Sequence, residues 1–257
     1  MSVLHRLRRH PFDVEAHFDF SLVLAYALPA PALEPLLPPG LELDRVGDLG
    51  LLAVALVQTA DLRPAGWPRA LGRDFFLSGY RVFAHLRDRP SIRGLRILRS
   101  DADSRLMTWS GNLFTRYGYQ LCRARVERAS EQRLSVAVDG PAALALEADL
   151  RPAEQPPPGS PFRDLKEARR FAGPLPNTFG WEPETRSLVI VGSVRVHWQP
   201  VPVSVEVRRL DFLDRFSEPA RLANAFYVED VDYRWKRGIL ERVSRSPASP
   251  AGSRPRR

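Results

Sequence analysis

Short segments in which apolar and polar residues alternate recur along most of this chain of 257 residues. Because the side chains of a strand point alternately to its two faces, a period of two indicates β-structure with one buried face. The pattern predicts strands over residues 15–28, 41–46, 50–58, 78–87, 94–100, 119–126, 133–138, 142–149, 186–198, 201–210, 222–229 and 231–241. Many short strands with few helices favour an antiparallel barrel or sandwich over alternating βαβ units.

Helices are expected over residues 31–37, 104–117 and 162–171. The second is the best defined, because its apolar residues share one face at helical spacing. These residues are Leu106, Trp109, Leu113 and Tyr117. Asp101 or Asp103 is expected to cap the first amides of this helix. Residues 61–77 are expected to form a long loop, and residues 151–161 are too rich in proline to pair in a sheet.

The charge of the chain is concentrated at its ends. The formal net charge is +8, from 38 basic and 30 acidic residues, but residues 13–241 contain 30 of each sign. We therefore expect frayed basic tails at residues 1–11 and 242–257, around a neutral domain over residues 12–241. Specific nucleic-acid binding needs cations gathered on the folded surface, so the sequence does not favour it.

The cysteine content and the start of the chain indicate the cellular compartment in which the protein is expected. Cys122 is the only cysteine, which excludes an internal disulfide and makes the cytoplasm the expected location. The arginines near the start and the apolar residues 20–28 resemble a signal peptide, but Asp13, Glu15 and Asp19 lie between them. No apolar run approaches the ~18 residues of a membrane-spanning helix.

Familiar catalytic and metal-binding motifs are absent from the sequence. It contains no G-x-S-x-G elbow, no G-x-G-x-x-G and no phosphate loop. Residues 101–104 faintly resemble phosphotransferases that attack through aspartate, but helix capping is the favoured interpretation. Asp230 and Asp232 alternate with Arg234 and Lys236 on one strand face, which indicates an exposed, neutralised face rather than a cation site. We expect no metal and no cofactor.

Cations and aromatic residues share a face in two expected strands. Arg81 lies on such a face within residues 78–87, and Tyr119 and Arg123 lie on another within residues 119–126. Arginine is exposed by default. If the sheet closes with these faces inward, however, the buried guanidinium groups need anionic partners, and a carboxylate ligand would supply one.

His197 is a further candidate on an expected strand, where it shares a face with Ser193 and Arg195. Burial beside arginine disfavours protonated histidine, which suits a neutral base or a hydrogen-bond donor to a ligand, although a structural histidine is the commoner case. The candidate ligand-binding residues are therefore Arg81, Tyr119, Arg123 and His197.

Four segments resemble the domain-of-unknown-function 2071 family, which is grouped with the acetoacetate decarboxylase-like superfamily. They are LLPPGLELD (36–44), GYRVF (79–83), LRILRSDADSRL (95–106) and GYQLCRARV (118–126). The resemblance extends over residues 12–240. It implies a single-domain α+β fold that is mostly antiparallel β, with a closed or partly closed β-barrel around a central cavity.

The resemblance does not extend to the decarboxylase mechanism. Decarboxylases of that superfamily form a Schiff base through a lysine in a Lys-Lys pair that follows a glycine and an aromatic residue, a nucleophile that is the standard example of activation by an adjacent cation. Gly118 and Tyr119 are the natural counterpart here, but no lysine follows them. The only lysines, Lys166 and Lys236, lie among charged residues, and arginine stays protonated and cannot replace them.

Three hypotheses follow, and the sequence leaves open whether the protein is an enzyme. The first is a small-molecule-binding barrel that lacks the Schiff-base lysine and binds an anionic or carbonyl-containing ligand such as an organic acid. The second is a decarboxylase-like lyase that uses Lys236 or Lys166. The third is a non-enzymatic interaction protein that engages nucleic acid or an acidic membrane surface through its basic tails. A homo-oligomer is compatible with all three.

Overall fold

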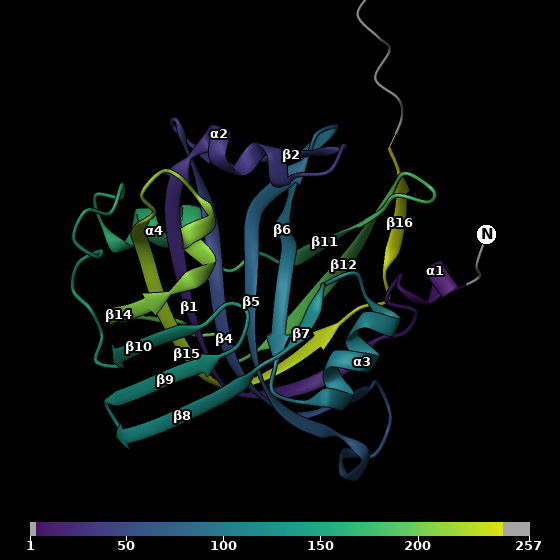
Figure 1. Ribbon diagram of the computed structural model, residues 1–257, viewed down its shortest axis with the longest axis horizontal. Coiled ribbons are helices and arrows are strands. Elements are labelled where there is room, and N and C mark those ends of the chain that lie inside the picture. The colour runs from purple at the N-terminus through teal and green to yellow at the C-terminus, as the bar shows by residue number, and fades with distance from the viewer. Residues whose placement is uncertain (1–3, 244–257) are drawn as a thin grey trace, which may run out of the picture.

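The computed structural model describes residues 4–243, in which seven strands form a closed ring (Figure 1). The ring order is β15, β1, β4, β5, β6, β11 and β12, and β12 pairs with β15 to close it. All neighbours are antiparallel except β6 and β11, which are parallel. The strands are β1 (Val14–Pro29), β4 (Leu49–Pro64), β5 (Arg73–Leu86), β6 (Arg89–Ala102), β11 (Asn177–Glu182), β12 (Ser187–Val196) and β15 (Arg221–Trp235). The expectation of a mostly antiparallel barrel is confirmed.

Shorter elements extend the ring or lie outside it. Edge strands are β2 (Leu41–Leu43), β3 (Arg45–Val46), β7 (Tyr119–Leu121), β13 (Val201–Pro202) and β16 (Ile239–Arg242). A separate sheet contains β14 (Ser204–Leu210), β10 (Leu144–Asp149), β9 (Arg133–Asp139) and β8 (Arg123–Ser130), in that order. The helices are α1 (Leu4–Leu7), α2 (Ala30–Leu33), α3 (Arg105–Phe114) and α4 (Leu165–Ala172), with 3-10 turns at Glu34–Leu36, Arg69–Leu71 and Asp211–Arg215. No helix within residues 4–243 is long and apolar enough to cross a membrane.

The main hydrophobic core lies between the outer surface of the barrel and the four-stranded sheet. Leu22, Leu24 and Leu56 of the barrel are fully buried in one cluster with Val136 and other residues of β9 and β10. Figure 1 shows this sheet lying across β1, β4 and β5. The residues of this cluster lie on the outward faces of these strands, so a different set of side chains lines the barrel interior.

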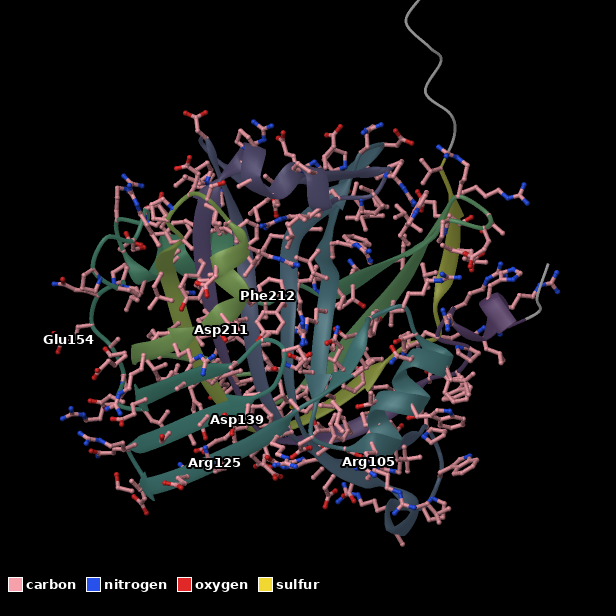
Figure 2. All side chains as sticks on the ribbon, viewed as in Figure 1. Arg105, Arg125, Asp139, Glu154, Asp211 and Phe212 are labelled. Carbon is pink, nitrogen blue, oxygen red and sulfur yellow. The ribbon has the colours of Figure 1, made fainter. Side chains whose placement is uncertain are left out.

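An aromatic pair joins the barrel to the connection that follows β14. The ring of Tyr80 on β5 stacks on Phe212 with 4.0 Å between ring centroids, and its hydroxyl donates to the carbonyl of Ala142 at 3.1 Å. Phe212 lies inside the molecule in Figure 2, whereas Arg125 and Asp139 lie on the exposed side of the outer sheet. Burial of the Tyr80 and Phe212 rings therefore helps to hold the sheet on the barrel.

Helix α4 closes one end of the barrel. Ala168 and Ala172 on the helix are fully buried against Ala25, Ala27 and Ala53 of the barrel wall. Small side chains at these positions allow the helix to approach the strands closely. Asp164 caps the helix by accepting a hydrogen bond from the amide of Glu167 at 2.7 Å, which fixes where it begins.

Several local expectations are wrong. Residues 61–77 are not a long loop, because β4 continues to Pro64 and β5 starts at Arg73, each paired with neighbouring strands of the ring. Residues 221–235 form one strand where two were expected, and β11 was not anticipated. The turn-forming residues of 61–77 suggested a loop, but pairing in the ladders of β4 and β5 overrides that local preference.

The cap of α3 also differs from the expectation. Ser104 caps the helix by accepting from the amide of Met107 at 3.3 Å. Asp103 instead accepts from the amide of Phe76 at 2.8 Å, and Asp101 pairs with Arg99 at 2.6 Å. Asp103 thus ties the residue before the α3 cap to β5, and the Asp101 contact stays within β6.

The segment before β1, which the sequence suggested would fray, is bound to the barrel. The guanidinium of Arg9 donates to both carboxylate oxygens of Glu182 at 2.6 and 2.8 Å, and Glu182 is fully buried. Burial alone would raise the pKa of Glu182, but hydrogen bonds from Arg9 and Thr185 hold it below its ordinary value. The amide of Gly238 donates to the carbonyl of His10 at 2.9 Å. Most of the expected C-terminal tail, residues 244–257, lies outside the described residues.

We predict that Arg9→Met lowers the free energy of unfolding by about 2 kcal/mol, because it leaves the buried carboxylate of Glu182 without its bidentate partner. Arg116, at 3.8 Å, remains as a weaker partner. Arg8→Met is the matched control, since Arg8 is exposed on the same segment. Urea denaturation of the three proteins measures the effect, and equal midpoints for both variants would contradict it.

Candidate functional site

The barrel encloses a cavity of about 390 Å³. Its wall is formed by β1, β4, β5, β6, β12 and β15, and its open end lies among α3, the segment before β1 and the turn at Arg69–Leu71. No aspartate, glutamate or lysine occurs among the described residues that line it, whereas four arginines do. The cavity is therefore electropositive inside a largely apolar wall, as in many ligand sites.

The residues of β5 that line the cavity run from its open end to its closed end. In order from the open end, they are Arg73, Phe75, Leu77 and Arg81. Phe83 follows along the strand and belongs to the cluster packed against α4. Alternation along the strand explains why they share the inner face. Arg81 thus lies deep in the barrel, near the end that α4 closes.

Arg81 is an enclosed cation without an acidic partner. It forms no ion pair with any residue in the described range, and its buried Nε atom has no hydrogen-bond partner there. Burial lowers the pKa of Arg81, with a smaller contribution from the positive charge of Arg195. Guanidinium nevertheless stays protonated in proteins, so a full positive charge occupies the closed end of the cavity.

Gly79 provides the space that this guanidinium occupies. A Cβ atom at Gly79 would lie 3.0 Å from one terminal nitrogen of Arg81 and 3.1 Å from its Nε. The side chain of Arg81 therefore folds back over Gly79, toward the open end of the cavity. A larger residue at position 79 would displace it.

Neutral phenols surround the cation. Burial raises the pKa of Tyr119, and it raises that of Tyr117 to about 12 even though Tyr117 shares a 2.9 Å hydrogen bond with Thr178. Tyr233 lies close enough to Arg81 to interact with its charge. Because the hydroxyls of Tyr117 and Tyr119 stay protonated at neutral pH, they are hydrogen-bond donors and not the missing counter-charge.

A second guanidinium, that of Arg195, lies beside the first. It is opposite Tyr233 across the β12–β15 pair and stacks 4.8 Å from the ring centroid of Trp198 and 5.6 Å from that of Tyr233. It donates to the carbonyl of Leu175. The indole Nε1 of Trp198 is buried without a hydrogen-bond partner among the described residues. Arg81 and Trp198 thus carry unpaired donors, and no carboxylate occurs among the described residues that line the cavity.

The structure brings together two of the four candidate residues. Arg81 and Tyr119 both line the cavity. Arg123 is exposed on β8 of the outer sheet, because the chain leaves the barrel at Cys122 and does not continue as one strand. His197 is exposed and has a left-handed backbone (φ 60°) one residue beyond the end of β12, so the alternation that would have turned it inward has ended.

Sequence reasoning missed Tyr117, Arg195, Trp198 and Tyr233 as lining residues. Arg195 was visible only as a neighbour of His197 on the same expected face. Tyr233 was assigned to a strand whose charged residues seemed to face solvent. The available signal was alternation along β12 and β15, but the direction of the faces depends on ring closure, which no local pattern encodes.

Neither lysine reaches the barrel cavity. The amine of Lys236 lies 3.6 Å from the carboxylate of Asp13 on the surface. Lys166 lines a second, smaller pocket of about 280 Å³ beside α4, together with Arg169 and Asn224. The described residues also contain no group of three or more His, Cys, Asp or Glu side chains that could hold a metal ion.

The closed ring and its cavity define the fold of acetoacetate decarboxylase-like proteins. Acetoacetate decarboxylase from Legionella pneumophila is similar over 90% of this chain and 88% of its own, with a TM-score of 0.60 and 13% identity. The enduracididine biosynthesis enzyme MppR in complex with pyruvate is similar over 90% of each chain, with a TM-score of 0.58 and 13% identity. A decarboxylase-like enzyme from Sphingomonas wittichii RW1 has a TM-score of 0.58, 13% identity and coverage of 93% and 96%.

The family follows from the sequence match. Residues 15–171, more than half of the chain, match the domain-of-unknown-function 2071 family, described as an uncharacterized conserved protein. The chain belongs to this family. No curated protein matches it.

The stability of the protein is expected to fall on acidification because of His10, which lines the open end of the cavity. Burial lowers the pKa of His10, and its Nδ1 has no partner among the described residues. The unfolded chain binds a proton below about pH 6.5, whereas the folded chain keeps this imidazole neutral. The stabilising contribution is therefore complete above that pH and is lost progressively below it.

His10→Asn should weaken this pH dependence of the melting temperature, because asparagine tolerates the left-handed backbone at this position (φ 55°) and does not titrate. His197→Asn is the matched control, with a similar backbone (φ 60°) at an exposed position. A melting temperature that falls equally with pH in all three proteins would exclude His10 as the cause.

Proposed function

We propose that this protein binds a small organic anion, a carboxylate or keto acid, in the barrel cavity, with the guanidinium of Arg81 as its main partner. The observation that carries the proposal is the enclosed positive charge of Arg81, which lacks an acidic partner in the described chain. An uncompensated buried charge is costly, and a ligand carboxylate would compensate it.

The other guanidinium groups near the barrel support this interpretation by contrast. Arg9 is held by the carboxylate of Glu182, and Arg99 pairs with the buried Asp101. These two arginines are thus matched to carboxylates, whereas Arg96, which does not line the cavity, donates to the carbonyl of Phe179 at 3.2 Å. The neutral donors Tyr119 and Trp198 beside Arg81 could complete the contacts to the oxygen atoms of an anion.

The comparisons add support for the ligand class. A structural neighbour is described as a complex with pyruvate, which is both a carboxylate and a carbonyl compound. At 13% identity the likeness concerns the fold, so the ligand is inferred from the cavity itself. The binding is proposed to be non-covalent, since Lys166 and Lys236 lie outside the barrel cavity. Cys122 is buried and free, in keeping with the cytoplasmic location that we propose.

We predict opposite effects of Arg81→Met on stability and on binding. Without ligand, the variant should be more stable than the native protein by about 1 kcal/mol, because an uncompensated charge is removed from the interior. Its affinity for 2-oxobutanoate should fall about 30-fold or more, because the charged hydrogen-bonding partner is lost. Thermal unfolding and calorimetric titration measure the two quantities.

Arg123→Met is the matched control, since Arg123 is exposed on the outer sheet and has no ion-pair partner within the described residues. It should bind as the native protein does. Gly79→Ala retains the charge but displaces the guanidinium, so it should bind more weakly at nearly native stability. Unchanged affinity in Arg81→Met would refute the proposed role.

Covalent chemistry is tested separately. After incubation with acetoacetate and borohydride, the mass of the protein should be unchanged, because no lysine amine lines the barrel cavity among the described residues. A stable adduct that is lost in Lys166→Gln or Lys236→Gln would instead support the lyase hypothesis and identify the lysine.

A further inference from the structure

The two ends of the barrel cavity differ in chemistry, and this difference bears on the ligand class within the proposed function. Arg81 lies near the closed end, and its charge interacts with Arg195 and with Tyr117, Tyr119 and Tyr233. The wall between the two ends is apolar, with Leu77 on β5 beside Val57 on β4 and Phe18 on β1. A ligand that fills this space must therefore present an apolar body behind its anionic group.

The open end remains apolar where it meets solvent. Leu71, in the turn before β5, and Leu106, on α3, line the cavity yet are 54% and 49% exposed. Phe12 lines the same end, is 36% exposed and packs edge-to-face on Phe114. Large apolar side chains gathered at the opening of a cavity indicate apolar contacts that the free protein does not make.

The axial distance between the two ends suits an extended molecule. Phe75 and Gly79, over which the Arg81 guanidinium lies, are four residues apart on one strand. This corresponds to about 14 Å along β5, and to less along the barrel axis because barrel strands are tilted. A compact keto acid such as pyruvate would occupy only the closed end. The cavity wall from Leu77 to Leu71 would then have no ligand contacts.

The arginines at the open end do not offer an equivalent anion site. Arg63 donates to the carbonyls of Asp61 and Trp67 and pairs with Glu15 at 3.5 Å. Arg73 is exposed at the surface, where water already solvates its charge. The uncompensated charge of Arg81 is the one that gains most from a carboxylate, which orients the ligand with its anionic group inward.

We propose that the ligand is a monocarboxylate with an extended aliphatic tail, bound with its carboxylate at Arg81 and its tail directed toward Phe12, Leu71 and Leu106. This inference rests on the proposed function, because it adds a tail to the anion expected there. In this arrangement the end of the cavity at Arg81 binds the carboxylate, and the rest of the cavity selects ligands by the length of their tail.

Calorimetric titration of the full chain with acetate, butanoate, hexanoate and octanoate tests the inference. Affinity should rise about fourfold for each methylene group added until the tail reaches the open end, as expected for burial of an aliphatic chain. Equal affinity along the series would overturn the inference and leave the proposed anion site intact. Octan-1-ol, which has as many carbon atoms as octanoate but no charge, is the reference. If octan-1-ol bound as tightly as octanoate, the proposed function itself would be overturned.

Two variants separate the parts of the cavity. Leu71→Ser should weaken octanoate about fivefold and leave acetate unchanged, because only the longer tail reaches this residue. Leu121→Ser is the matched control, since Leu121 is 43% exposed on β7 and does not line the cavity. Arg81→Met should weaken both acids. If Leu71→Ser lowered the affinities for acetate and octanoate by the same factor, its effect would be structural. That result would refute the direction proposed for the tail.

Discussion

The enclosed guanidinium of Arg81 is the constraint to which the rest of the barrel must adapt. A charge held away from bulk water without a counter-ion opposes folding, so the stability of this protein must come from elsewhere in the structure. The main hydrophobic core answers that need, because it lies between the barrel and the four-stranded sheet and does not involve the cavity. Folding and ligand binding thus depend on opposite faces of the same strands.

This division explains the unusual alternation along β5. Its outward residues, Tyr80 and Val82, are fully buried in the core, whereas its inward residues include Gly79 and Arg81. A small barrel would ordinarily fill its interior with bulky apolar side chains. Here alanines and Phe83 fill the interior at the α4 end, and a second cluster around Phe18 and Val57 packs against Tyr233 and Trp235. The remaining space is what makes the cavity.

The sequence was informative about the strands because burial on one face imposes a period of two wherever the strand pairs. Residues 15–28 and 133–138 were therefore recognised closely, as β1 and β9. The family resemblance supplied the barrel, which the period alone could not distinguish from a sandwich. Arg81 and Tyr119 line the cavity, as the alternation allowed, since Arg81 lies within β5 of the ring and Tyr119 within the edge strand β7.

The positions of Arg123 and His197 depend on interruptions of the strands, which an alternating pattern does not reveal. Arg123 lies outside because the chain crosses from one sheet to another at Cys122, and His197 because the backbone turns left-handed after Val196. The apolar face of α3 is more exposed than its sequence pattern predicted. The helical spacing of its apolar residues predicted a buried face, yet Leu106 and Trp109 are 49% and 63% exposed. A stripe of this kind indicates a contact, but it does not say whether the partner is the protein core or a molecule that enters from solution.

The contrast between Arg9 and Arg81 shows how one residue type serves two purposes in this fold. Arg9 neutralises a buried carboxylate and fixes the segment beside the cavity opening, so its charge is satisfied in the free protein. Arg81 lies over Gly79 beside the protonated phenol of Tyr119 and has no carboxylate partner among the described residues, so the proposed ligand would supply its counter-charge. Arginine suits both roles because its guanidinium stays protonated even when enclosed, as a lysine amine does not. The two sites thus differ in whether the folded chain itself supplies a carboxylate to the guanidinium.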